Sequence, residues 1–161
     1  MSKENADKEQ KRSFKREAFS WIACIVVTIL LTEFILNFVI INANIPSGSM
    51  ENTIMTNDKL IALRTSYWFN DPKRGDIIIF KYPDDETEWF IKRVISLPGE
   101  TVLVKDGKVY INGSKKALSE PYIKEEPVED FGPYKVPKNG YFVMGDNRNN
   151  SNDAREWETH Y

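Results

Sequence analysis

The chain has 161 residues, a net charge of −2 and charged residues of mixed sign. This length allows one small domain, and no basic stripe of the kind that binds nucleic acid is present. The only cysteine, Cys24, cannot form an intrachain disulfide. Without a Cys/His cluster a zinc site is not expected, although a weak calcium site among scattered carboxylates stays open. We therefore expect neither a metal nor a cofactor.

The N-terminal part of the sequence predicts a membrane anchor. Residues 1–18 mix basic and acidic side chains and are expected to form a solvated cytoplasmic tail. The apolar run from Trp21 to Ile41 would be about 31 Å long as a helix at roughly 1.5 Å per residue, enough to cross a hydrocarbon core of about 30 Å. Basic residues lie just before this run and none follows until Lys59. This asymmetry predicts a cytoplasmic N-terminus and an extracytoplasmic chain after Ile41.

Two features of the apolar run leave alternatives open. A cleaved signal peptide also begins with basic residues, but its apolar region usually covers about 7–15 residues, and Asn42-Ala43-Asn44 is a poor cleavage site. We therefore favour a retained single-pass anchor over residues 19–41. Glu33 and Asn37 share one helix face, and an acidic group at membrane depth is costly. They either contact another helix or a substrate, or are tolerated within the span, and we favour the second interpretation.

The rest of the chain, residues 42–161, predicts an all-β domain. From Asp58 onward apolar and polar residues alternate, which is typical of strands. The predicted strands cover residues 59–64, 76–81, 89–96, 101–105, 108–111 and 141–144. Asp106-Gly107 is a strong hairpin signal, and the prolines of residues 114–138 indicate a long surface excursion. We expect a twisted, partly closed barrel or paired sheets, preceded by one transmembrane helix.

Lys92 lies in a predicted strand whose two faces are both mainly apolar. It shares a face with Phe90 and Val94, while Arg93 points the other way. Burial lowers the pKa of a lysine, whereas the guanidinium of an arginine stays charged. Lys92 is therefore the residue here that could act as a base near neutral pH. The alternative is an edge-strand lysine whose ammonium reaches water, and the strand pattern by itself favours that alternative.

Ser49 lies in a short irregular segment just after the apolar run. The only histidine, His160, is next to the last residue, so a Ser-His-Asp triad would have to be built from a chain end. A desolvated lysine such as Lys92 can activate a serine instead. The Ser47 hydroxyl could point at the same oxyanion as the Ser49 backbone N–H. The alternative is an ordinary Ser/Gly linker, which the local sequence by itself favours.

Four segments, taken together and in order, resemble the conserved boxes of type I signal peptidases. These are membrane-bound serine proteases that cut signal peptides from exported proteins. The segments are Ile45–Met50, Arg74–Phe80, Ile91–Glu100 and Gly145–Arg155. The resemblance covers residues 45 to about 157, and it overturns both the linker and the exposed-lysine alternatives. The short 114–138 excursion and the single anchor resemble the compact Gram-positive form of the family.

The resemblance implies a catalytic role for four side chains. Ser49 would be the nucleophile and Lys92 the general base. Ser47 would supply a hydroxyl to the oxyanion hole beside the Ser49 N–H. Ser151 would hydrogen-bond to Lys92 and orient it. No residue of the family pattern calls for a metal or a cofactor.

The resemblance also implies a supporting ion pair and a substrate site. Asp153 and Arg155 would form the ion pair, and Ile45 and Pro46 would line shallow pockets for small substrate side chains. The implied function is a membrane-anchored endopeptidase that removes N-terminal signal peptides after small residues, in Ala-x-Ala fashion. Its partners would be exported preproteins and the lipid bilayer of the plasma membrane, with no nucleic acid.

Several residues depart from the family pattern. Asn52 stands where proline is usual, Ser96 where glycine is common, and Ala154 where serine is frequent. The sequence ends at Tyr161, before the closing strand and Gly-Lys segment that family members carry. Either the chain is a piece of a longer protein or its domain lacks that edge element.

Two other functions compete with the peptidase hypothesis. A repressor-type self-cleaving domain resembles this fold and also uses serine and lysine, but it carries a DNA-binding helical module where this chain has a membrane span. A non-catalytic membrane-anchored β-domain could bind exported peptides without cutting them. Ala154 and the early end at Tyr161 are the features that support this second alternative.

Overall fold

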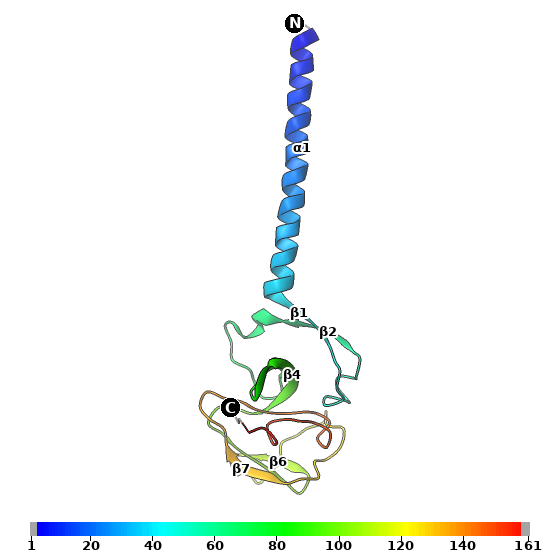
Figure 1. Cartoon of the computed structure of the whole chain (residues 1–161). Helices are drawn as coiled ribbons and strands as arrows, with labels where there is room; N and C mark the ends of the chain where they lie inside the picture. The colour runs from blue at the N-terminus through cyan, green and yellow to red at the C-terminus, as the bar shows by residue number, and fades with distance from the viewer. Residues whose placement is uncertain (1–2, 159–161) are drawn as a thin grey trace. The chain divides into compact units, whose positions relative to one another are not determined.

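The computed structural model of the chain describes residues 3–158, and their side chains from residue 14 onward. Helix α1 (Lys3–Phe34) continues as a π-helical segment, Ile35–Val39, before strand β1 (Ile40–Asn44) begins (Figure 1). Its stretch Phe14–Val39 is long and apolar enough to cross a membrane, and no part of its most apolar window is buried within the chain. The described part of the chain thus contains the helix that the sequence predicts.

Both ends of this helix differ from the prediction. Residues 3–18, expected as a solvated tail, are helical, because their Lys, Arg, Glu, Gln and Ala residues are good helix formers. The helix ends at Val39, two positions before the predicted end of the span. Ile40 and Ile41 belong to β1 instead, where β-branched residues are favoured.

The polar pair in the anchor forms hydrogen bonds within its own helix. The Asn37 side-chain amide donates to the Glu33 backbone carbonyl at 2.8 Å and to its carboxylate at 3.1 Å. Local hydrogen bonds of this kind reduce the cost of polar groups at membrane depth. That this pair is tolerated within the span stays a prediction.

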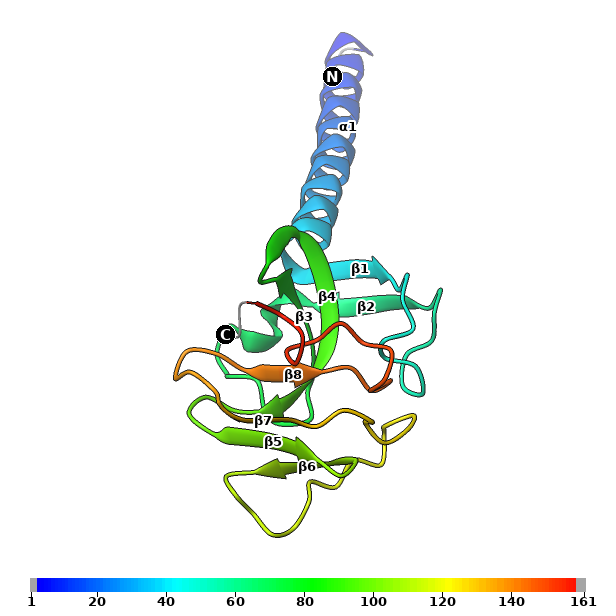
Figure 2. The same cartoon turned by 60° about the horizontal axis from the view of Figure 1, so that its bottom comes forward.

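After the anchor the chain forms three small sheets. Strand β1 pairs with β2 (Lys59–Leu63). One three-stranded sheet has the order β3-β4-β8 and the other the order β6-β5-β7 (Figure 2). Their strands are β3 (Ile77–Tyr82), β4 (Asp85–Ser96), β5 (Thr101–Lys105), β6 (Lys108–Ile111), β7 (Phe131–Lys135) and β8 (Phe142–Met144). The predicted all-β class is confirmed, with partly closed sheets and, among the described residues, no closed barrel.

Two strands, β1 and β7, were absent from the prediction. The isoleucines of β1 continue the apolar run of the anchor, so their pattern is indistinguishable from that of the span. Strand β7 contains Gly132 and Pro133, which usually argue against a strand. Its pairing with β5 is irregular between Val102 and Val104, where the Gly132-Pro133 step falls. The predicted surface excursion of residues 114–138 is therefore interrupted by a strand.

The core lies under the second half of β4 and around β5 and β8. Val94 and Ile95 point to opposite faces of β4, yet both are fully buried, so this half of the strand is covered on two sides. The aromatic rings of Phe80, Tyr82 and Phe90 pack around Trp157 with centroid distances of 5.6–6.0 Å. This packing holds β3, β4 and the chain after β8 together.

Candidate active site

The loop that carries Ser49 is held at both sides by buried apolar residues. Ile45 before it and Met50 after it pack in one small cluster with Ile54, and Ile91 of β4 packs against that cluster. Burial of these side chains fixes where the loop begins and where it returns. Ser49 itself is 6% exposed, so its hydroxyl lies in a nearly enclosed position.

The backbone around Ser49 is also tied to the turn that follows β8. The backbone N–H of Asn147 donates to the Ser49 carbonyl at 3.0 Å. The Asn147 side-chain amide donates to the Gly48 carbonyl, also at 3.0 Å. Ser47 Oγ lies 3.4 Å from Ser49 Oγ. The hydroxyls of both serines are therefore close enough to act on one substrate carbonyl.

Lys92 lies in β4, paired with Ile78 of β3, and only 4% of the residue is exposed. Its ammonium is 5.3 Å from the centroid of the Phe90 ring, on the face that the alternation predicts. Burial lowers the pKa of Lys92 from 10.5 to about 8; the nearby Asp153 charge opposes this shift and Arg155 adds to it. No carboxylate among the described residues forms an ion pair with it.

Ser47, Ser49 and Lys92 line the same groove, which has a volume of about 430 Å³. The lining comes mainly from residues 43–49 and from Glu88–Lys92 of β4. Ile45 and Pro46, the predicted substrate-binding residues, are both part of it. Two extended backbone segments beside one groove suit a peptide that binds as an added strand.

Ser151 is brought close to the nucleophile loop but does not hydrogen-bond to Lys92 in this structure. Its hydroxyl is buried and has no hydrogen-bond partner among the described residues. The Ser151 side chain and the Ser49 carbonyl both occupy the space that a Cβ at Gly145 would need, so a side chain there would clash with each of them. The absence of a side chain at Gly145 therefore allows these serines to approach one another.

Asp153 and Arg155 form an ion pair with two contacts. Arg155 Nε donates to Asp153 Oδ1 at 2.8 Å and Nη2 donates to Oδ2 at 3.0 Å. Asp153 also accepts the Gly145 backbone N–H at 3.0 Å, and Arg155 donates to the Arg148 carbonyl at 2.6 Å. The pair thus holds both ends of the turn 145–148. Asn147 of this turn contacts the Ser49 carbonyl.

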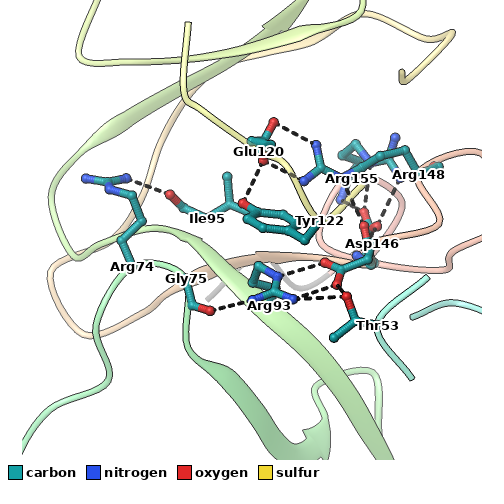
Figure 3. Close-up of polar contacts among 12 residues, drawn as sticks. Thr53, Arg74, Gly75, Arg93, Ile95, Glu120, Tyr122, Asp146, Arg148 and Arg155 are labelled. Carbon is teal, nitrogen blue, oxygen red and sulfur yellow. Dashed lines mark hydrogen bonds and ion pairs between the residues drawn. The ribbon is translucent and has the colours of Figure 1, made fainter. Parts of the chain in front are cut away.

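A buried charged network on the other face of β4 was missed by the sequence analysis (Figure 3). Arg93 donates to both carboxylate oxygens of Asp146, at 2.8 and 2.6 Å. It also donates to the Gly75 carbonyl at 2.7 Å, and the Thr53 hydroxyl donates to the same Asp146 carboxylate. A charged arginine on an apolar strand face requires a partner. The apolar neighbours of Arg93 in the sequence could therefore have predicted a buried carboxylate beside it.

The network continues into the predicted surface excursion. The Tyr122 ring stacks on the Arg93 guanidinium at 3.9 Å, and the Tyr122 hydroxyl donates to Glu120 at 3.0 Å. Glu120 accepts two hydrogen bonds from Arg148, at 3.1 and 2.6 Å. Part of residues 114–138 therefore packs against this network and is half-buried. Its irregular sequence has no periodicity that would predict this contact.

Comparisons with known proteins identify relatives of this chain. A model of the family "Signal peptidase, peptidase S26" matches residues 18–159. "Probable signal peptidase I-2" of a Synechocystis strain is 45% identical over 82% of this chain and 62% of its own length. "Signal peptidase I" of Bacillus amyloliquefaciens is 37% identical over 91% of this chain and 82% of its own length.

A crystal structure of a signal peptidase I from Enterococcus faecalis is 38% identical, with a TM-score of 0.47, and covers 53% of this chain and 86% of that one. The chain thus spans less than two thirds of the Synechocystis relative, at 62%, but most of the Bacillus one, at 82%. By the match over residues 18–159 and these identities, the chain belongs to the signal peptidase family, peptidase S26.

Proposed function

We propose that this chain is a membrane-anchored serine endopeptidase that removes N-terminal signal peptides from exported preproteins. Ser49 is the nucleophile and Lys92 the general base. The observation that carries the proposal is that both residues line one groove, where burial lowers the pKa of Lys92 to about 8. A lysine with that pKa is neutral in a substantial fraction of molecules near pH 8 and can accept a proton.

The chemistry follows from these groups. Ser49 Oγ attacks the scissile carbonyl carbon while Lys92 Nζ takes the hydroxyl proton. The carbonyl oxygen becomes an oxyanion, which accepts hydrogen bonds from the Ser49 N–H and the Ser47 hydroxyl. Lys92 then returns the proton to the leaving amine as the peptide bond breaks. A water then attacks the acyl carbon while Lys92 takes one of its protons. Lys92 passes this proton to Ser49 Oγ as the ester bond breaks and the signal peptide leaves with a new carboxyl group.

The substrate binds as an extended strand along the groove. Backbone hydrogen bonds from residues 43–49 and from Glu88–Lys92 supply affinity. Ile45 is 3% exposed and, with Pro46, leaves shallow apolar room rather than a deep pocket. Small residues before the cut, as in Ala-x-Ala, fit such room, and bulkier ones do not. Asp153 and Arg155 support the site by holding the turn beside Ser49.

The location we propose is the plasma membrane, with the apolar helix as the anchor. Its basic flank, with no basic residue after Ile41 until Lys59, favours a cytoplasmic N-terminus and an extracytoplasmic peptidase domain from residue 42 onward. Protease added to intact cells should digest that domain and spare an N-terminal tag. A tag that is digested from outside would invert this topology.

The test of the function is preprotein processing by the full chain in detergent micelles. Wild-type protein should cut a preprotein with Ala at both small-residue positions, and Ser49→Ala should not. A serine-directed acylating inhibitor should label wild type and leave Ser49→Ala unlabelled. Binding of the preprotein without cleavage would indicate a peptide-binding domain. Cleavage of the chain itself, but not of the preprotein, would indicate a self-cleaving domain.

A further inference from the structure

Asn52 links the nucleophile loop to a distant part of the chain. Its side-chain amide donates to the Tyr122 carbonyl at 3.1 Å and lies 3.4 Å from the Ile123 carbonyl. Both acceptors belong to the segment between β6 and β7. These contacts need a side chain that can donate, and the Asn52 amide carries two N–H groups, enough for both carbonyls.

The backbone conformation of Asn52 couples its position to that of Ser49. Its φ of 88° lies in the left-handed region, which few residues other than glycine adopt. The same turn is closed by the Met50 carbonyl, which accepts the N–H groups of Thr53 at 3.1 Å and Ile54 at 2.8 Å. Met50 directly follows Ser49. A shift of Asn52 is therefore transmitted through one turn to the nucleophile.

The segment to which Asn52 is bound is itself anchored. The Lys124 backbone N–H donates to the Asp146 carbonyl at 3.1 Å. The Tyr122 ring packs on Arg93, the neighbour of Lys92 in β4, at 3.9 Å. The carbonyls that hold Asn52 are thus fixed to the same strand and turn that carry the rest of the site. Asn52 therefore connects the loop that carries Ser49 to a segment that packs against β4, the strand of Lys92.

We propose that Asn52 is a positioning residue for the cleavage reaction. By bonding to the carbonyls of residues 122–123 it keeps Ser49 within reach of Lys92. This inference rests on the proposed function, because it presupposes Ser49 as nucleophile. Its signature is a loss in the chemical steps, with substrate binding left nearly unchanged, since Asn52 does not line the groove.

The experiment compares full-length wild type with Asn52→Gly and Asn57→Gly. Glycine adopts a positive φ without cost, so Asn52→Gly removes the amide and keeps the backbone conformation. Asn57 is a matched control: it is also exposed, with a φ of 71°, and its side chain makes no hydrogen bond within the described residues. Asn52→Asp is a second variant, because a carboxylate keeps the shape but cannot donate.

Asn52→Gly and Asn52→Asp should each lower kcat by about tenfold, as expected when reacting groups are slightly misplaced, with KM within about twofold. Acylation of Ser49 by a small serine-directed reagent should slow by the same factor. Asn57→Gly should change neither rate. Thermal unfolding of each variant is measured in parallel. All rates are then taken at a temperature well below the unfolding midpoint of every variant.

Three results would overturn the inference: an unchanged kcat, a loss confined to KM, or a lowered unfolding midpoint without a lower kcat. The proposed function is tested separately in the same assay by wild type and Ser49→Ala. If wild type cleaves, Ser49→Ala does not, and Asn52→Gly is fully active, the function stands and the role of Asn52 falls. An inactive wild type would overturn both.

Discussion

Arg93 and Asp146 form a buried ion pair on the face of β4 opposite Lys92, with contacts of 2.8 and 2.6 Å. Neighbouring residues of one strand thus have opposite environments. Arg93 is neutralised by a carboxylate, whereas Lys92 is desolvated without an ion-pair partner among the described residues. The paired arginine fixes the strand, and the unpaired lysine keeps a lowered pKa. One strand can therefore carry an arginine that stabilises the fold next to a lysine that is able to act as a base.

Removing Asp146 should therefore destabilise the protein strongly. In Asp146→Ala the Arg93 guanidinium stays buried without its carboxylate, which typically costs about 3–5 kcal/mol. Denaturant unfolding of the full chain in detergent would measure the loss. Lys124→Ala is the control, because its ion pair with Glu51 is solvent-exposed and should contribute far less. Equal effects of the two variants would contradict this account of the network.

Gly145→Ala should abolish preprotein cleavage. A Cβ at Gly145 would clash with the Ser151 hydroxyl and the Ser49 carbonyl, so that Ser49 has to move away from the base. Gly113→Ala is the control, because it has open space around its Cα and a φ of 67°. There the substitution costs only the left-handed backbone penalty, about 1–2 kcal/mol. Normal kcat in Gly145→Ala would show that this close packing does not set the position of Ser49.

Local signals in the sequence were enough for several elements of the fold. The Asp106-Gly107 hairpin joins β5 and β6, and both residues have positive φ, 50° and 74°, as a two-residue hairpin turn requires. Strand β7 could not be predicted in this way. Its Gly132-Pro133 step removes the alternation, and its partner β5 lies far away in the sequence, so only the tertiary pairing defines it.

The candidate site was predictable where its residues fall in the family's boxes. The alternation of the strand placed Lys92 on an apolar face, yet by itself it favoured a lysine whose ammonium reaches water. The local sequence around Ser49 by itself favoured an ordinary linker. Tyr122 could not be found, because its segment has no periodicity and its role comes from stacking on Arg93. Asn52 replaces the usual proline with a φ of 88°, which a proline ring cannot adopt.

Ser151→Ala should reduce kcat more than it raises KM. The Ser151 hydroxyl is buried without a partner among the described residues and is available to orient Lys92 during catalysis, rather than to hold substrate. Steady-state kinetics on a preprotein would separate the two effects. Asn150→Ala provides the contrast, because Asn150 lines the groove and its loss should appear in KM. A KM effect alone in Ser151→Ala would assign this serine to substrate binding.

The activity should rise with pH through the titration of Lys92. Because the base must be neutral, kcat/KM should increase as pH rises towards the pKa of about 8 and level off above it. The free energy of unfolding should also depend on the titration of Lys92. Between pH 8 and 10.5 the unfolded chain keeps the Lys92 proton that the folded chain has released, so the free energy of unfolding rises with pH in that window. Lys92→Ala should flatten this rise.

Lys92→Arg decides whether position 92 supplies a base or merely a positive charge. The guanidinium keeps the charge but cannot release its proton near neutral pH, so the arginine variant should be as inactive as Lys92→Ala. The measurement is single-turnover cleavage of a preprotein at several pH values, with Arg93→Lys as a control that alters the neighbouring cation on the opposite face. Because that control leaves Lys92 in place, it should keep the pH profile even where it loses stability. Substantial cleavage by Lys92→Arg would mean that no proton passes through position 92, and the Ser49–Lys92 dyad would have to be abandoned.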